Sequence, residues 1–255
     1  MHYDCATALH IGQREVQQDA VTADFSIGNP FGFAVLSDGM GGHAAGDMAS
    51  KIVVTEMFSE LKLRTGDAMA FERDIAQILR DAVRAANDCI SAHVIENPEH
   101  RGMGATVVAP VVFETRLYWV SVGDSPLYLF RSNKISRLNE DHSMAPQIDA
   151  MVKMGQLDPE VGKNHPDRSS LLSVLIGSSI PKLECKASPK DLEKGDIVVV
   201  ASDGVMTLEN DRISSELEKL QSENAADIAQ GLVDAVCNVD LPKQDNISVS
   251  VIKVI

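Results

Sequence analysis

Three aspartates stand where an apolar run meets a glycine or an asparagine. They are Asp38 before Gly39, Asp203 before Gly204, and Asp245 before Asn246. An earlier acidic turn at residues 12–19 adds Arg14 and Asp19. A carboxylate at the rim of a buried strand is costly unless something positive meets it. The pattern therefore predicts strand ends that converge on hard divalent cations, which prefer oxygen ligands.

The size and composition of the chain favour one large domain. The 255 residues are 44% hydrophobic, which is enough for a substantial core. No linker-like tract or internal repeat marks a boundary within residues 1–255, although the length alone would allow two domains. The net charge of −14 argues against a nucleic-acid partner, because phosphate backbones attract basic surfaces.

The cysteines and the apolar runs indicate a cytoplasmic protein. Cys5, Cys89, Cys185 and Cys237 form no C-x-x-C pair, which favours free thiols in a reducing compartment. The first residues lack the basic and apolar regions of a signal peptide. The longest apolar runs, such as residues 107–113, are far shorter than the roughly 18 residues that a membrane span needs. No membrane contact is expected.

Hydrophobic periodicity predicts strands on either side of helices. Strands are expected at residues 21–27, 31–37, 105–113, 116–122, 127–131, 134–138 and 196–201 and from residue 247, with turns at 28–30 and 132–133. Helices are expected at 45–63, 71–94 and 225–236, and a helical flap at about 143–170. The strands do not alternate regularly with helices, which favours an antiparallel α+β fold over a parallel one. The pattern leaves the strand order open.

The short polar motifs occur in an order that is specific as a set. They lie at residues 14–19, 38–46, 103–106, 122–126, 141–143, 202–204 and 245–248, and the second reads Asp-Gly-Met-Gly-Gly-His-x-x-Gly. Together they resemble the signature of bacterial metal-dependent Ser/Thr protein phosphatases of the type 2C (PPM) class. The resemblance covers nearly the whole chain. Any one motif alone is weak evidence, because Asp-Gly is common in turns.

The resemblance implies a fold and an activity. The fold would be a four-layer α-β-β-α sandwich, in which helices flank two antiparallel sheets, formed by a single catalytic domain over residues 1–255. The activity would be hydrolysis of phosphoserine and phosphothreonine in proteins. Two Mn²⁺ or Mg²⁺ ions would activate a hydroxide that attacks phosphorus in line. The partner would be a phosphorylated protein, a bacterial Ser/Thr kinase or its target.

The resemblance also assigns roles to individual residues. The metal ligands would be Asp38 as the bridge between both ions, the Gly39 carbonyl, Asp203, Asp245 and, partly through water, Asp19. Arg14 would hold two oxygens of the phosphoryl group, for which its planar fork is suited. Asp38 and Arg14 are thus the expected catalytic residues.

Some positions depart from the family pattern. Bacterial relatives often bind a third ion through an aspartate matching Asp141 and a second one at the position of Thr207, so a third ion would be weak or absent here. Met40 stands where some members carry a histidine proposed as general acid, so His43, another group or water must protonate the leaving alcohol. Asp124, in a turn after a strand, reads most simply as a structural residue that caps its own loop.

Two other functions are compatible with these motifs. One is a catalytically weak or inactive module that binds phosphoproteins as a regulator, for which a missing core ligand would be the sign. The other is a hydrolase for a non-protein phosphoester, which would share the chemistry and differ in the substrate groove. The flap at 143–170 is expected to face the substrate and to tolerate changes that alter selectivity without abolishing hydrolysis of a small phosphoester.

Overall fold

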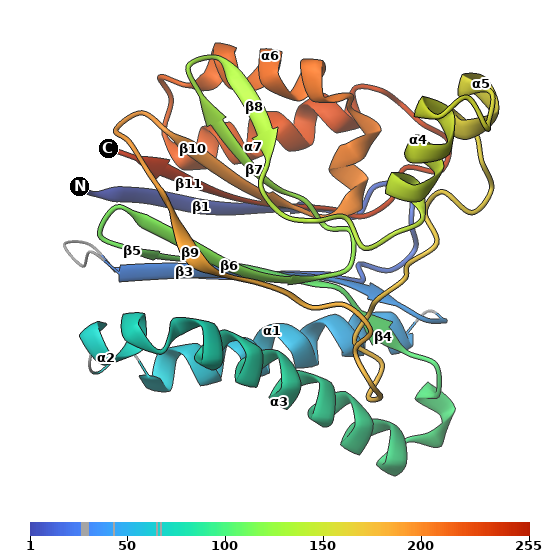
Figure 1. Cartoon of the computed structure of the whole chain (residues 1–255), viewed down its shortest axis with the longest axis horizontal. Coiled ribbons are helices and arrows are strands. Elements are labelled where there is room, and N and C mark those ends of the chain that lie inside the picture. The colour runs from blue at the N-terminus through green and yellow to red at the C-terminus, as the bar shows by residue number, and fades with distance from the viewer. Residues whose placement is uncertain (27–30, 43, 65, 67) are drawn as a thin grey trace.

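Two antiparallel sheets pack face to face, and helices cover both outer faces (Figure 1). The computed structural model describes residues 1–26, 31–42, 44–64, 66 and 68–255. The four-layer α-β-β-α sandwich inferred from the motifs is confirmed. The expected turn at 28–30 and His43 lie outside the described residues.

Each sheet combines strands from distant parts of the chain. The first has the order β1-β11-β10-β7-β8, with β1 at Tyr3–His10, β7 at Leu127–Arg131, β8 at Lys134–Arg137, β10 at Ile197–Ala201 and β11 at Ile247–Val254. The second has the order β2-β3-β5-β6-β9, with β2 at Asp19–Phe25, β3 at Phe31–Met40, β5 at Val107–Phe113, β6 at Arg116–Val122 and β9 at Glu184–Asp191. The short β4, Gly104–Ala105, pairs with the end of β3.

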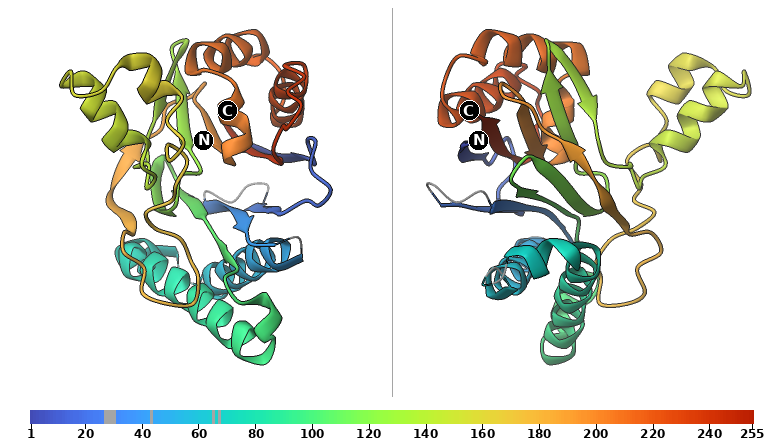
Figure 2. Two further views of the ribbon diagram at one scale, coloured as in Figure 1. Left: turned by 90° about the vertical axis from the view of Figure 1, so that its right-hand side faces the viewer. Right: turned by 60° about the vertical axis from the view of Figure 1, so that its left-hand side comes forward.

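The helices divide between the two outer faces, and two of them stand apart (Figure 2). Helices α1 (Ala44–Arg64), α2 (Ala68–Arg73) and α3 (Ile75–Glu96) lie on the second sheet, whereas α6 (Asn210–Leu220) and α7 (Ala225–Cys237) lie on the first. Helices α4 (Ala145–Lys153) and α5 (Pro159–Lys163) project from one end of the sandwich in the segment predicted as a flap. The 3-10 turns η1 (Pro98–His100) and η2 (Asp203–Thr207) follow α3 and β10.

Three layers of apolar contacts hold the sandwich together. Strand β10 is apolar throughout because both of its faces are buried. Val198 and Val200 point into the layer between the sheets, and Val199 points toward α7. A strand that is buried on both faces needs no polar alternation. Leu36 and Trp119 of the second sheet complete the layer between the sheets.

The predicted helix over residues 71–94 is wrong in one respect, because it is broken at Asp74. There α2 ends and α3 begins, and Asp74 has φ −103° and ψ 12°, outside the helical range. The Arg73 guanidinium donates two hydrogen bonds to the Asp74 carboxylate, at 3.2 and 2.8 Å. Aspartate is a weak helix former, and here its carboxylate is bound to Arg73 and does not cap α3. Within the described residues, no helix combines the length and the apolar character needed to cross a membrane.

Candidate active site

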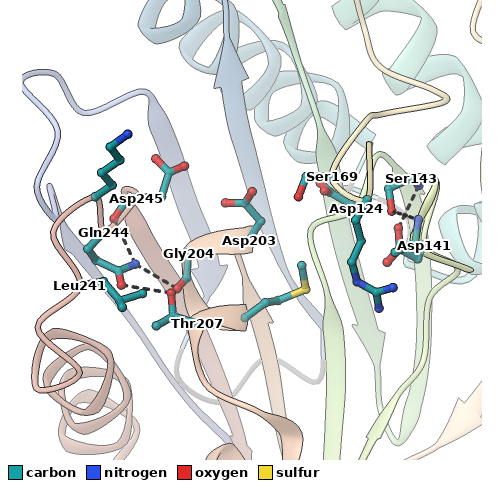
Figure 3. Close-up of a pocket in the computed structure, with 14 residues that line it drawn as sticks. Asp124, Asp141, Ser143, Ser169, Asp203, Gly204, Thr207, Leu241, Gln244 and Asp245 are labelled. Carbon is teal, nitrogen blue, oxygen red and sulfur yellow. Dashed lines mark hydrogen bonds between the residues drawn. The ribbon is translucent and has the colours of Figure 1, made fainter. Parts of the chain in front are cut away.

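The strand ends bring the predicted aspartates to one edge of the sandwich, from both sheets. Asp19, the first residue of β2, is directly opposite Asp38, near the end of β3. In the other sheet, Asp203 follows β10 and Asp245 precedes β11, and these two strands are antiparallel neighbours. The end of one strand and the start of the next therefore meet at the same edge. Figure 3 shows Asp203 between Asp245 and Asp124.

Asp19 is buried, and Asp38 and Asp203 are half-buried close to it, which raises the pKa values of these three carboxyl groups. Burial, followed by the charges of Asp19 and Asp203, raises the pKa of Asp38 well above its ordinary value. Burial raises the pKa of Asp19 to about 6. It also raises that of Asp203 to about 6, with the Asp245 charge as the next cause and a hydrogen bond to Asp38 opposing the shift. The cluster is short of positive charge.

Two buried side-chain oxygens at the cluster lack a hydrogen-bond partner among the described residues. The Ser202 and Ser248 hydroxyls lie beside the Asp19 carboxylate and lower its pKa in part. Asp19 Oδ2 and Ser248 Oγ nevertheless have no partner at hydrogen-bond geometry in the described part of the chain. Since a buried oxygen without a partner is costly, a bound cation or its water would satisfy Asp19.

The donor set fits divalent ions that keep part of their water shell. No group of three or more His, Cys, Asp or Glu side chains among the described residues is already arranged around one point. The carboxylates instead form an open cluster. Mg²⁺-like ions often bind through one or two carboxylates and retain several waters, so an open cluster suits them better than a closed cage would.

A hydroxyl network fixes the backbone of Asp38. The Asp38 amide donates to Thr106 Oγ1 at 3.0 Å, and the Thr106 amide donates to the Asp38 carbonyl at 2.8 Å. Thr106 Oγ1 also shares a hydrogen bond of 2.8 Å with Ser125 Oγ. Residues of the motifs at 103–106 and 122–126 therefore fix the position of Asp38 through hydrogen bonds. Gly39 has to be a glycine here, because a Cβ would collide with the backbone carbonyl of Gly46 in α1.

Asn246 holds the loop that carries Arg14. Its Oδ1 accepts from the Gln18 amide at 2.8 Å, and its Nδ2 donates to the carbonyls of Ile11 and Val16 at 2.8 and 3.1 Å. Arg14 Nη2 lies 2.6 Å from Asp245 Oδ2, with the arginine side chain 53% exposed. Arg14 is thus placed at the rim of the cluster by the residue that follows Asp245.

Two cavities adjoin this cluster. The first, of about 610 Å³, is lined by Arg14, Asp38, Gly39 and Met40 together with flap residues Ser169 and Ser170. The second, of about 480 Å³ and shown in Figure 3, extends past Asp141 and Thr207. Both are bordered by Asp124, Asp203 and Asp245. A substrate can therefore reach the carboxylates from either side.

Asp141 and Thr207 line the second cavity together with Asp124, Asp203 and Asp245, but both are engaged by other side chains. Asp141 Oδ2 is 3.0 Å from Arg137 Nη1, and its Oδ1 accepts from the Ser143 amide at 2.9 Å. Thr207 Oγ1 donates to Gln244 Oε1 at 3.0 Å. Both side chains line the second cavity, but each already has a partner within the protein.

Asp124 belongs to the cluster, which the sequence analysis did not predict. It does contact its own backbone amide, as expected of a residue that caps its loop. However, burial raises its pKa to about 7, with Asp203 and then Asp141 as further causes. Its side chain borders both cavities. The only sequence signal was its place in the motif at 122–126.

The family model described as "Protein phosphatase 2C" matches residues 8–237. The chain belongs to the protein phosphatase 2C family. The match includes Arg14, Asp19, Asp38 and Asp203 and stops before Asp245.

Individual proteins of this family resemble the chain over most of its length. It is 32% identical over 222 residues to the serine/threonine protein phosphatase PstP of Mycobacterium tuberculosis, which covers 86% of the chain. The chain spans 40% of the length of that relative. A crystal structure of the M. tuberculosis phosphatase PstP/Ppp superposes with a TM-score of 0.81 and 29% identity, over 100% of this chain and 99% of the other.

A further structure is that of the PstP catalytic domain in complex with two manganese ions. It matches with a TM-score of 0.75 and 29% identity, over 98% of this chain and 97% of the other. This protein phosphatase 2C member therefore shares its fold with a domain that binds two metal ions.

Proposed function

We propose that this protein is a phosphatase for phosphoserine and phosphothreonine in proteins and uses two Mn²⁺ or Mg²⁺ ions. The observation that carries the proposal is the cluster of buried and half-buried, mutually repelling aspartates from both sheets, with Arg14 at its rim. The two manganese ions of the related PstP domain support it. Asp38 and the Gly39 carbonyl, Asp203, Asp245 and, partly through water, Asp19 would hold the ions.

When bound, the two ions would supply Lewis-acid charge and lower the pKa of a bound water toward neutrality, so that no protein nucleophile is needed. Asp245 can serve either Arg14 or a metal ion. With Asp245 committed to a metal, the Arg14 guanidinium is free to donate to two phosphoryl oxygens. Met40, 41% exposed at the rim of the first cavity, has no proton to give, so we assign protonation of the leaving alcohol to water.

A third ion is not favoured at Asp141, because Thr207, bound to Gln244, supplies no second carboxylate there. Asp124 would be the better ligand, since it lies beside Asp203 and its raised pKa reflects unmatched negative charge. The flap would contact the protein part of the substrate, and a Ser/Thr kinase or its target would be the natural partner. The regulator without activity is not favoured, because Asp38, Asp203 and Asp245 are all present.

The test compares the intact protein with Asp38→Asn and Asp203→Asn. We expect Mn²⁺-dependent hydrolysis of p-nitrophenyl phosphate and of a phosphothreonine peptide, reduced at least about 100-fold in both variants. Calorimetric titration with Mn²⁺ should show weakened binding in the same variants. The matched control is Asp211→Asn, which removes an exposed carboxylate of α6 and should retain activity and metal binding. Metal-independent hydrolysis, or full activity in Asp203→Asn, would refute the proposal.

A further inference from the structure

At the rim of the second cavity lies a basic side chain that has no partner among the residues the structure describes. Arg168 and Lys243 both line that cavity. The Arg168 guanidinium is committed to Asp149 through contacts of 2.6 and 3.1 Å. Lys243 is exposed and, within the described part of the chain, makes no hydrogen bond or ion pair. Its ammonium group is therefore available to a ligand.

The loop that carries Lys243 is fixed by its neighbour Gln244, which is 5% exposed. Gln244 Oε1 accepts from Thr207 at 3.0 Å, and its Nε2 donates to the Gly204 carbonyl at 3.2 Å (Figure 3). Its backbone carbonyl accepts from the Gln13 amide at 2.8 Å. The main chain at Gln244, next to Lys243, is therefore held against the turn that carries Asp203.

The second cavity is where residues next to a phosphorylated residue would lie. In the proposed reaction the phosphoryl group occupies the first cavity, beside Arg14 and Asp38. The two cavities meet at Asp203 and Asp245, so an extended peptide, advancing about 3.3 Å per residue, would continue into the second. Leu241 and Met206, 42% and 39% exposed, offer apolar contact there.

We propose that Lys243 is a specificity-determining residue that binds an anionic group flanking the phosphorylated residue of the substrate. The group is an acidic side chain or a second phosphate, since both present oxygens to an ammonium. The inference rests on the proposed phosphatase function. A single ammonium at an exposed rim favours such a substrate by about two- to fivefold, as exposed ion pairs do, and the preference weakens with salt.

The experiment measures kcat/KM for phosphothreonine peptides in which one flanking residue at a time is alanine or glutamate. A second series carries phosphoserine at the best glutamate position and separates a second phosphate from a carboxylate. The readout is the ratio of glutamate to alanine peptide within each variant, so a general change of activity cancels. We expect the ratio to fall to about one in Lys243→Gln, to persist in Lys243→Arg and to invert in Lys243→Glu.

The matched control is Lys194→Gln, which removes the same charge at the other end of β10. Lys194 precedes that strand and Asp203 follows it. The control should keep the wild-type ratio. The inference is overturned if no glutamate position raises kcat/KM in the wild-type protein, or if the preference survives in Lys243→Gln. Absence of hydrolysis of every peptide and of p-nitrophenyl phosphate would instead refute the proposed function, and the inference with it.

Discussion

At the level of single residues, the carboxylates of the site differ in how they are partnered. Asp245 and Asp141 each have an arginine, at 2.6 and 3.0 Å. Asp19 and Asp124 are buried, and their nearest charged neighbours include other carboxylates that raise their pKa values. The negative charges of Asp245 and Asp141 can be neutralised by arginines of the protein. Those of Asp19 and Asp124 need a bound proton or cation.

Asp124 should make the stability of the metal-free protein depend on pH. Its folded pKa of about 7 lies above the ordinary value of 3.8, so the folded protein binds this proton more tightly than the unfolded chain. The resulting stability is fully present below about pH 4 and is lost as the pH rises through about 7.

We therefore expect the free energy of unfolding in urea, with EDTA present, to be lower at pH 7.5 than at pH 5.5. Asp124→Asn should reduce that difference by roughly 2 kcal/mol. An unchanged difference in this variant would show that Asp124 does not titrate in this range.

The same residue shows where sequence reasoning stops. The motifs identified Asp38, Asp203 and Asp245 as members of one site, and the structure brings them to one edge. Asp124 reads as an ordinary turn aspartate, because its distinguishing feature is its closeness to Asp203 in a different sheet. Asn246 was missed for a similar reason, since its role depends on hydrogen bonds to residues 11, 16 and 18.

At the level of elements, the sequence predicted best the strands that are buried on both faces of their sheet. Continuous apolar runs located β5 and β10, and the turn between β7 and β8 lies where Ser132 and Asn133 predicted it, both with positive φ. Strands β1 and β9 and helix α6 were not predicted. The two strands form sheet edges with mixed polar sequences, and α6 buries only Ile213 and Leu217, so none has a strong apolar pattern.

The flap is the element that should separate protein substrates from small ones. Arg168, after α5, holds Asp149 of α4 through two contacts and thereby ties the two ends of the flap together. Asp149→Asn should loosen this link and lower kcat/KM for a phosphothreonine peptide severalfold, while hydrolysis of p-nitrophenyl phosphate is largely retained.

A suitable control is Glu160→Gln, on the exposed side of α5. Equal losses for both substrates in Asp149→Asn would contradict a role for the flap in substrate selection.

At the scale of the whole molecule, the site connects the two sheets. Asp19 and Asp38 belong to one sheet, and Asp203 and Asp245 flank strands of the other. An ion shared between them would link the two halves of the sandwich at the edge where carboxylate repulsion pushes them apart. Metal binding should therefore stabilise the fold as a unit.

We expect Mn²⁺ at 100 times its dissociation constant to raise the free energy of unfolding by about 2.7 kcal/mol for one site. Urea unfolding with Mn²⁺ or EDTA measures this at constant pH. Asp203→Asn should lose most of the gain. A stabilisation of the same size in that variant would mean that the ion binds elsewhere.

The position of β11 within the first sheet has a consequence for biosynthesis. This strand follows all the other described strands in sequence, yet it lies between β1 and β10 and pairs with both. During translation, β1 and β10 are synthesised before β11, the strand that pairs with both. Asp245 is synthesised just before β11. A nascent chain lacking β11 would have neither a closed first sheet nor a complete set of acidic ligands. If Asp245 is a metal ligand as proposed, the complete site would form only after β11 has been synthesised and has paired with β1 and β10.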